Sequence, residues 1–361
     1  MKKKIMILGL VSLILIVSIM AMIKADICEC NSCGSCMDAL NNASCTEVRL
    51  TANIINVSGI CIDDPENFSN KVFDCQSHII DGDGFVIHGI YLNSKQNNTI
   101  KNCIITDFYY GIYLWDSNNN TIINNNASSN GYGGIYLGSS SNNTLTNNIA
   151  NSNDRGILLH SSSNNTLINN IARSNGDSGI FLYSSSNNNL INNIANSNSI
   201  GIYLHYFSNK NTIINNTANS NSDVGIYLEP FSNNNTIINN TANSNSNGIS
   251  LSSSSNNNTL INNTIRLNRY GIYIFDNSNF NKILNNKISN NTEIGITISN
   301  CDPWGWCENG NTNNTIENNE ILNNKIGIRL DSSSNNTITN NTASSNSEYG
   351  IHLNSSSNNI L

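Results

Sequence analysis

The chain has 361 residues, a net charge of −7 and only 11% charged residues. No basic run occurs beyond its first four residues, which argues against nucleic acid and anionic membrane surfaces as partners. The excess of Asn and Ser is typical of disordered chains. Aliphatic residues at fixed positions, described below, argue against disorder.

Residues 1–25 are predicted to be a targeting segment. Three lysines at positions 2–4 precede a largely apolar run at positions 5–23. This pattern predicts a secretory signal peptide cleaved after Ala25, but the run is also long enough to remain as a membrane anchor. Either way, we expect export to the extracellular space, the cell surface or a periplasm-like space, with membrane contact only through this segment.

Residues 26–84 are predicted to form a cysteine-rich cap and the first coil. Four of the ten cysteines lie close together, at Cys28, Cys30, Cys33 and Cys36. Four thiolates at this spacing suit a metal or iron–sulfur site, whereas an even number of cysteines in an exported protein favours disulfides. We favour disulfides, because no histidine accompanies the cluster.

Residues 85–361 repeat a unit of 22–24 residues that opens with a Gly-Ile dipeptide. A fixed period of this length predicts a solenoid. One spacing is longer, at 32 residues. The opening glycines are Gly89, Gly111, Gly134, Gly156, Gly179, Gly201, Gly225, Gly248, Gly271, Gly295, Gly327 and Gly350.

Each unit contains three short runs in which fixed aliphatic residues alternate with free positions. In the unit that begins at Gly111, the fixed residues are Ile112, Leu114, Ile122 and Ala127. This alternation predicts strands with one buried face. Three such strands per unit, with no helix-forming segment, predict an all-β fold, a right-handed parallel β-helix of about twelve coils. At about 4.8 Å per coil, the rod would be about 55–60 Å long.

Asparagine recurs in two registers, which we expect at corners in the left-handed conformation. We also expect the stacked amides to form hydrogen-bonded ladders along the rod. The first register is Asn102, Asn124, Asn147, Asn169, Asn192, Asn215, Asn239, Asn262, Asn285, Asn318 and Asn340, and the second is Asn130, Asn153, Asn175, Asn198, Asn221, Asn245, Asn268, Asn291, Asn324 and Asn346.

Two further cysteine pairs are predicted from the repeat. Alignment of the first coils places Cys75 and Cys103 in one column, one coil apart, which is within reach of a disulfide. Cys301 and Cys307 flank two tryptophans within the longer spacing, and we expect a loop closed by a short disulfide at residues 301–307. Such an inserted loop is either a binding element or a decoration of the rod.

The run Val72–Gly82, the run Thr99–Cys103 and the serial Gly-Ile-Tyr-Leu units resemble a known group of exported right-handed β-helix proteins. This is the NosD-like, carbohydrate-binding and sugar-hydrolase-type group, especially its archaeal members. The resemblance extends from Cys45 to the end of the chain and implies the fold. The name NosD implies a periplasmic accessory role in copper-enzyme maturation, but no His/Met copper motif is present, and no acidic cluster typical of pectate lyase or epimerase relatives occurs.

The outer face of the first strand in each unit is the candidate site. Its aromatic residues point away from the Ile and Leu core positions, so we expect them to be exposed. They either stack against sugar rings or stabilise the sheet by stacking on one another. The candidate glycan-binding residues are Tyr113, Trp115, Tyr136, His160, Phe181, Tyr183, Tyr203, His205, Tyr227 and Glu229.

These observations predict an exported binding or structural module whose partner is an extracellular glycan or a cell-envelope component. We assign no catalytic residue, cofactor or metal ligand. A polysaccharide lyase, epimerase or hydrolase is the first alternative, because His205 and Glu229 lie one coil apart and could form an acid–base pair. A metal-handling accessory protein that uses Cys28, Cys30, Cys33 and Cys36 is the second.

Overall fold

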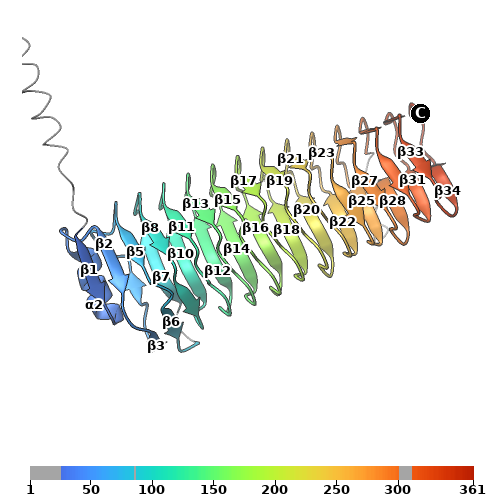
Figure 1. Ribbon diagram of the computed structural model, residues 1–361. Helices are drawn as coiled ribbons and strands as arrows, with labels where there is room; N and C mark the ends of the chain where they lie inside the picture. The colour runs from blue at the N-terminus through green and yellow to red at the C-terminus, as the bar shows by residue number, and fades with distance from the viewer. Residues whose placement is uncertain (1–25, 85–86, 301–310) are drawn as a thin grey trace, which may run out of the picture.

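The computed structural model describes residues 26–84, 87–300 and 311–361. The chain winds into a rod of stacked coils, with the cap at one end and the last coil at the other (Figure 1). Each strand pairs in parallel with the equivalent strand of the neighbouring coil. The predicted parallel β-helix is confirmed.

Two long sheets form two sides of the rod. The short-strand sheet contains β1 (Ile27–Cys30), β2 (Glu47–Leu50), β5 (Val72–Asp74), β8 (Thr99–Lys101), β11 (Thr121–Ile123), β13 (Thr144–Thr146), β15 (Thr166–Ile168), β17 (Asn189–Ile191), β19 (Thr212–Ile214), β21 (Thr236–Ile238), β23 (Thr259–Ile261), β26 (Lys282–Leu284), β29 (Thr315–Glu317) and β32 (Thr337–Thr339). The long-strand sheet contains β4 (Ile62–Asp63), β7 (His88–Asn93), β10 (Tyr110–Trp115), β12 (Gly133–Gly138), β14 (Arg155–His160), β16 (Ser178–Tyr183), β18 (Ile200–His205), β20 (Val224–Glu229), β22 (Asn247–Leu251), β25 (Tyr270–Phe275), β28 (Ile294–Ser299), β31 (Ile326–Asp331) and β34 (Tyr349–Asn354).

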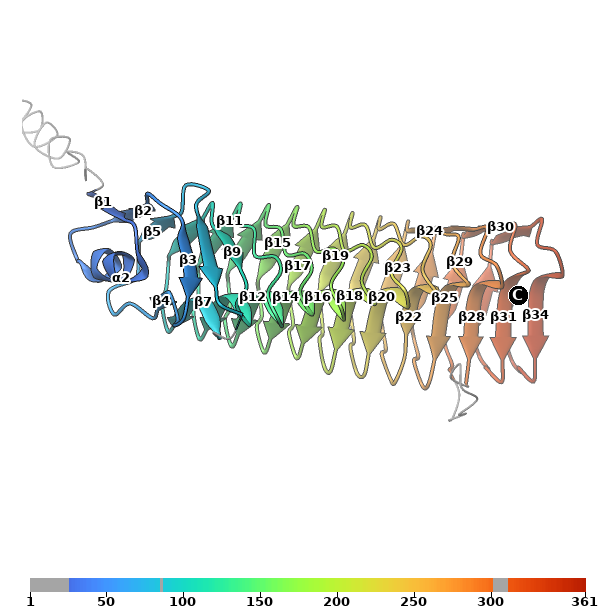
Figure 2. The same cartoon turned by 90° about the horizontal axis from the view of Figure 1, so that it is seen from below.

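The third side is made of two smaller sheets joined by single bridges (Figure 2). One contains β3 (Ile54–Val57), β6 (Ile79–Gly82) and β9 (Ile104–Thr106), and the other contains β24 (Thr264–Arg266), β27 (Lys287–Ser289), β30 (Glu320–Leu322) and β33 (Thr342–Ser344). Inside the three sides, the predicted aliphatic columns fill the core, and Ile112, Leu114, Ile122 and Ala127 are completely buried.

The coil count differs from the prediction. The short-strand sheet contains fourteen strands, so the rod has about fourteen coils rather than twelve. The additional coils lie in the cap, where β1 and β2 pair with the rest of the sheet without a Gly-Ile dipeptide. At about 4.8 Å per coil, the rod is about 60–65 Å long.

The glycine that opens each unit lies where neighbouring coils approach most closely. A Cβ atom added at Gly201 would lie 2.5 Å from the carbonyl oxygen of Gly225 and 2.9 Å from that of Ala195. Real Cβ atoms essentially never lie within 3.0 Å of another non-bonded heavy atom. The repeat therefore requires glycine for space at this position.

Three asparagine ladders run through the interior. In each, the side-chain oxygen of one asparagine accepts from the backbone N–H of its equivalent in the preceding coil, as from Asn170 to Asn193 (2.9 Å). The ladders run through Asn98, Asn120, Asn143, Asn165, Asn188, Asn211, Asn235, Asn258, Asn281, Asn314 and Asn336; through Asn125, Asn148, Asn170, Asn193, Asn216, Asn240, Asn263, Asn286, Asn319 and Asn341; and through Asn130, Asn153, Asn175, Asn198, Asn221, Asn245, Asn268, Asn291, Asn324 and Asn346.

The predicted assignment of the asparagine registers is partly wrong. The first register, such as Asn192 (φ 56°), has the expected left-handed backbone, but its side chains are exposed and the continuous ladder is one residue later. The second register forms a ladder without a positive φ. The left-handed residue is the one before it, as at Ser197 (φ 60°). The asparagines that form the ladders are therefore buried, and the residues with the left-handed backbone are the ones directly before them.

The cap contains the helix α2 (Cys33–Asn41), which the sequence analysis did not predict. The Ser32 side chain accepts from the backbone N–H of Ser35, and the Ser35 hydroxyl oxygen accepts from the backbone N–H of Ser32, which completes a capping box. At the other end, the Lys71 ammonium group donates to the carbonyl oxygens of Leu40 (2.6 Å) and Asn42 (2.7 Å). Burial lowers the pKa of Lys71. The helix covers the first coil at the N-terminal end of the rod (Figure 2).

Disulfides link the clustered cysteines, in the pairs Cys28–Cys45, Cys30–Cys36 and Cys33–Cys61. The disulfide prediction is confirmed. The metal alternative is wrong, because every thiolate that it requires is part of a disulfide. Disulfides persist in oxidising compartments, which indicates an extracellular or periplasmic location.

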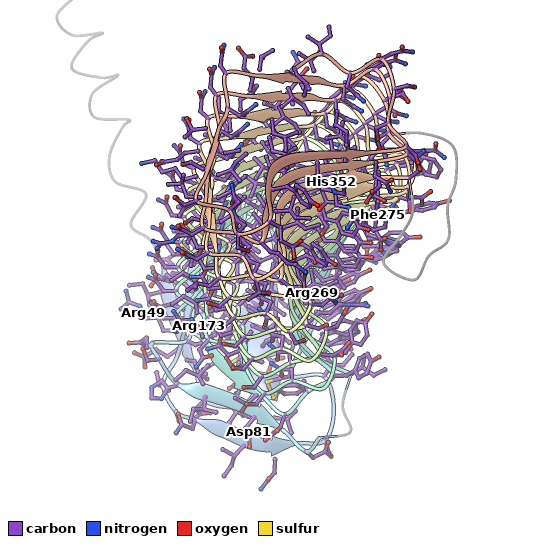
Figure 3. All side chains as sticks on the ribbon, turned by 90° about the vertical axis from the view of Figure 1, so that its right-hand side faces the viewer. Arg49, Asp81, Arg173, Arg269, Phe275 and His352 are labelled. Carbon is purple, nitrogen blue, oxygen red and sulfur yellow. A yellow bond between two sulfur atoms is a disulfide. The ribbon has the colours of Figure 1, made fainter. Side chains whose placement is uncertain are left out.

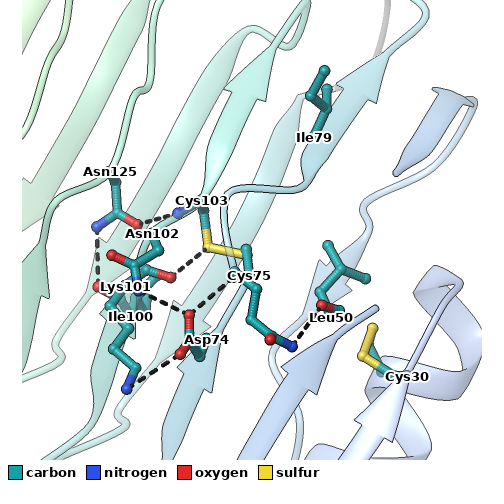
Figure 4. The surroundings of a disulfide bond; sticks show 12 residues. Cys30, Leu50, Asp74, Cys75, Ile79, Ile100, Lys101, Asn102, Cys103 and Asn125 are labelled. Atoms are coloured by element: carbon teal, nitrogen blue, oxygen red, sulfur yellow. Dashed lines mark hydrogen bonds and ion pairs between the residues drawn. A yellow bond between two sulfur atoms is a disulfide. The ribbon is translucent and has the colours of Figure 1, made fainter. Parts of the chain in front are cut away.

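Cys75 and Cys103 form the disulfide expected between stacked coils, with Cα atoms 4.7 Å apart (Figure 4). Two contacts strengthen the same junction. Lys101 forms an ion pair with Asp74 (3.3 Å), and the Gln76 amide donates to the carbonyl oxygen of Leu50 (3.1 Å). The first coils are therefore tied both covalently and by polar contacts.

Within the described residues, no helix is long and apolar enough to cross a membrane. The predicted targeting segment at residues 1–25 lies outside the described residues. The same holds for Cys301, Cys307 and the loop predicted between them.

Candidate functional site

The outer face of the long-strand sheet carries three parallel columns of side chains. Strand pairing places Tyr110, Tyr113 and Trp115 of β10 beside Gly133, Tyr136 and Gly138 of β12. The start column holds the first residue of each strand, the middle column the fourth, and the end column the sixth. The candidate residues from Tyr113 to Glu229 all lie in the middle and end columns.

The middle column is less exposed than the sequence predicted. Tyr136 and Phe181 are each 6% exposed and Leu158 is 3% exposed. They lie outside the core, in a second apolar cluster that the start-column residue Tyr110 and the nearby Tyr132 cover. The exposure prediction is therefore wrong for these residues.

Tyr110, Tyr132 and Arg155 complete this surface and were not predicted as site residues. Tyr110 and Arg155 directly precede a repeat glycine. Their shared position in the repeat could have identified them as part of the outer face. Tyr132 belongs to a turn whose packing the repeat pattern does not reveal.

Aromatic stacking is continuous through the first part of the face. The rings of Tyr113 and Tyr136 lie 4.5 Å apart and are almost parallel. Tyr113 also stacks with Trp115 at 6.5 Å. Trp115 is 39% exposed, so the end column, rather than the middle one, presents an accessible aromatic ring.

A hollow of about 220 Å³ opens where the middle column contains Leu158 instead of an aromatic residue. We call it the Leu158 hollow. It is lined by Tyr110, Tyr132, Tyr136, Arg155, Leu158, His160, Phe181 and Tyr183. The shorter leucine leaves a recess between the rings of the preceding and following coils.

Polar groups at the Leu158 hollow are held in place by neighbours. The Arg155 guanidinium lies 4.7 Å from the centre of the Phe181 ring and bonds to Asp177 at 2.6 Å. The Tyr136 hydroxyl and His160 Nδ1 are 2.9 Å apart, and His160 meets the edge of Tyr183. The hollow thus combines aromatic walls with oriented donors and acceptors.

A second cluster surrounds Glu229. Tyr203 and Tyr227 donate to its two carboxylate oxygens. Ser252 bonds to Oε2 at 3.2 Å, and His205 Nδ1 lies 3.8 Å from Oε1. The structure therefore brings together His205 and Glu229, as the sequence analysis expected from their one-coil separation, and adds two tyrosines.

Burial controls the protonation of this cluster. It raises the pKa of Tyr203 and Tyr227, and the adjacent Glu229 charge adds to the effect. Both phenols therefore remain donors. Burial also lowers the pKa of His205, and the Glu229 charge opposes this change. Near neutral pH, the cluster therefore combines a neutral imidazole with two phenols that donate hydrogen bonds to Glu229.

Comparison with protein families identifies the chain. The family model described as "Periplasmic copper-binding protein (NosD)" matches residues 42–217 and 203–306, which together make up most of the sequence. The chain belongs to the NosD family. A second model, "Right handed beta helix region", matches residues 287–361 of this NosD-family chain, while no curated protein matches it.

Solved structures share the fold of the NosD-family chain. The A-module of the Azotobacter vinelandii mannuronan C-5 epimerase AlgE4 is 16% identical with a TM-score of 0.62, over 91% of this chain and 92% of that one. A mutant of the periplasmic alginate epimerase AlgG is 17% identical with a TM-score of 0.59, over 85% and 76%. The catalytic domain of a GH87 α-1,3-glucanase is 14% identical with a TM-score of 0.53, over 91% and 64%. These identities establish the fold alone.

The residues that the structure describes in this NosD-family chain offer no donor set that fits copper. Within the described residues, no three His, Cys, Asp or Glu side chains are grouped to hold a metal ion, and no cysteine there is free. The thioether of Met37 accepts from the backbone N–H of Asp63 at 3.2 Å. We therefore derive no chemistry through a metal.

Proposed function

We propose that the protein is an exported glycan-binding module and that the aromatic face of the long-strand sheet binds the glycan. The observation that carries this proposal is the Leu158 hollow, where aromatic rings and hydrogen-bonding groups converge. Sugar rings have apolar faces that stack on aromatic side chains, while their hydroxyls need donors and acceptors. Tyr136, Tyr183 and His160 supply both.

The cellular location belongs to the same proposal. We expect residues 1–25 to direct export, either as a cleaved signal peptide or as an anchor that holds the rod at the cell surface. The partner is then an extracellular glycan or another cell-envelope component. The polysaccharide substrates in the titles of the AlgE4, AlgG and GH87 structures support this choice by analogy of fold.

Replacing Trp115, Tyr136 and Tyr183 together by alanine is expected to weaken glycan binding by about 100-fold. Trp115 and Tyr183 each contribute about 0.5–1.5 kcal/mol through stacking, and loss of the buried Tyr136 removes a wall of the Leu158 hollow. About 1.4 kcal/mol corresponds to a tenfold change in affinity. A glycan array probed with residues 26–361, wild-type and variant, identifies the ligand, and titration calorimetry measures the loss.

Phe280→Asn is the matched control for this variant. Phe280 is an exposed aromatic residue (53%) in the turn between β25 and β26, outside the three columns of the aromatic face. It has a left-handed φ of 58°, which suits asparagine. Its removal should leave glycan binding unchanged. Unaltered binding by a folded triple variant would contradict the proposed function.

Polysaccharide modification is a second candidate function, favoured by the cluster at Glu229. A neutral imidazole and a carboxylate 3.8 Å apart, flanked by phenols that remain protonated, could move a proton on a bound sugar. If the protein turns over the bound polysaccharide, Glu229→Gln should lower kcat by at least about 100-fold with little change in KM. Equal turnover by this variant would exclude Glu229 from the chemistry.

A further inference from the structure

A second hollow, of about 290 Å³, lies farther along the same face. We call it the Ser250 hollow. It is lined by Asp223, Val224, Tyr227, Ser246, Asn247, Ser250, Arg269, Tyr270 and Phe275. Arg269 and Phe275 border it from opposite ends of β25, and Figure 3 labels both in the view along the rod.

The hollow exists because one coil lacks its aromatic residue. In the middle column, Tyr227 is followed by Ser250 and then by Tyr273. Where the column is continuous, as between Tyr203 and Tyr227, the stacked rings lie 5.3 Å apart. Serine in place of tyrosine therefore removes one six-membered ring from the stack. The vacated space matches one pyranose ring, which is also a six-membered ring with an apolar face.

Polar groups around the Ser250 hollow have no partner among the described residues. The Ser250 hydroxyl is buried without a hydrogen bond, and the residue is 1% exposed. At the rim, Asp223 and Arg269 are exposed. The Asp223 carboxylate has no hydrogen bond or ion pair in the described chain, and the Arg269 guanidinium lies 5.1 Å from the centre of the Tyr270 ring. Buried polar groups in folded proteins are generally paired. The Ser250 hydroxyl departs from this rule, and together with the two charged groups at the rim it forms a polar surface that a ligand can complete.

Size and charge define the class of ligand. A volume of about 290 Å³ is at the lower limit for small-molecule pockets, so it accommodates one sugar unit rather than several. The carboxylate of Asp223 lies at the rim and that of Glu229 lies beside Tyr227, against one guanidinium. The excess of negative charge disfavours an anionic sugar.

We propose that the Ser250 hollow is a subsite for one neutral pyranose unit of a glycan. The ring occupies the position of the absent tyrosine against Tyr227, Tyr270 and Phe275. Asp223 accepts from sugar hydroxyls, and Arg269 donates to sugar oxygens. This inference rests on the proposed glycan-binding function. It adds the position of one subsite and the class of sugar that binds there.

The repeat itself supplies the test. Ser250→Tyr inserts the residue that the neighbouring coils carry in the same column, so it fills the hollow without introducing a foreign packing arrangement. Thr297→Tyr is the matched control, because it adds the same ring in the same column, two coils farther on. Asp223→Asn is a second test variant that removes charge without changing volume.

Titration calorimetry with cellohexaose, mannohexaose, xylohexaose and hexamannuronate distinguishes the outcomes. We expect a neutral hexasaccharide to bind, Ser250→Tyr to weaken it at least tenfold, Asp223→Asn to weaken it about fivefold, and Thr297→Tyr to change it less than twofold. Equal affinity of wild-type and both test variants would overturn the subsite, as would preference for hexamannuronate.

The two proposals fail in different ways. If the test variants bind as wild-type does while the Trp115/Tyr136/Tyr183 variant loses binding, the Ser250 subsite is wrong and the proposed function stands. If the wild-type protein binds none of these glycans and none on the array, both are wrong. Thermal melting of each variant separates loss of binding from loss of folding.

Discussion

Replacing Asn193 by leucine is expected to destabilise the rod by at least about 4 kcal/mol. The Asn193 side chain is completely buried. Its oxygen accepts from the backbone and side-chain N–H groups of Asn170 (2.9 and 3.0 Å), and its amide donates to Leu167 (2.9 Å) and Asn216 (3.0 Å). Leucine removes these four buried hydrogen bonds, at about 1 kcal/mol or more for each. The Asn216 side-chain oxygen keeps the backbone N–H of residue 193, and the Asn170 amide keeps Leu145, but the Asn170 backbone N–H loses its partner.

Urea unfolding followed by circular dichroism measures this loss, and hydrogen exchange at the Asn170 amide locates it. Asn192→Gly is the control on the adjacent residue. Asn192 is exposed and has a φ of 56°, a conformation that glycine adopts readily, so its stability should change by less than about 0.5 kcal/mol. If Asn193→Leu were as stable as wild-type, the ladders would not stabilise the fold.

Replacing Gly201 by alanine is expected to cost at least about 3 kcal/mol, although only one methyl group is added. The new Cβ would lie 2.5 Å from the carbonyl oxygen of Gly225 and 2.7 Å from the Asn221 amide nitrogen. Neither can move alone, because both belong to hydrogen-bonded coils packed on each side. The strain therefore forces neighbouring coils apart, as overpacking does in other tightly packed interiors.

Gly176→Ala is the corresponding control. The nearest atom to its added Cβ is the side-chain oxygen Oδ1 of Asp154, at 3.3 Å, which rotates away easily. We expect a change within about 0.5 kcal/mol, because alanine also restricts the unfolded chain. Chemical denaturation of both variants makes the comparison, and similar effects at the two positions would refute a special role for the repeat glycines.

The sequence predicts the rod well because the aliphatic positions that recur in every repeat are the residues that fill the core. Fixed positions such as Ile112 and Leu114 must be apolar in every coil, so their alternation reveals both strands and buried face. The cap was less predictable. Helix α2 depends on disulfides and on Lys71, which lie far apart in the sequence, and the first coils lack the repeat's opening dipeptide.

The sequence predicts on which face of the sheet the candidate side chains lie, but not how deeply they are buried. The repeat places Tyr136 and Phe181 on the outer face correctly. Their burial depends on Tyr110 and Tyr132, which approach from outside the two columns that the pattern singles out. The hollows at Leu158 and Ser250 are visible in the sequence only as departures from an aromatic column. A smaller residue in this column opens a hollow only if the aromatic side chains of the neighbouring coils do not turn into the space, and the sequence does not show their orientation.

The asparagine ladders hold the coils together without charge. An amide does not titrate in water and does not depend on a counter-ion, so these hydrogen bonds are insensitive to acidity and to salt, unlike surface ion pairs. Since each ladder spans most of the coils, this neutrality extends along the length of the rod. Coils joined in this way suit the extracellular or periplasmic surroundings that the disulfides indicate.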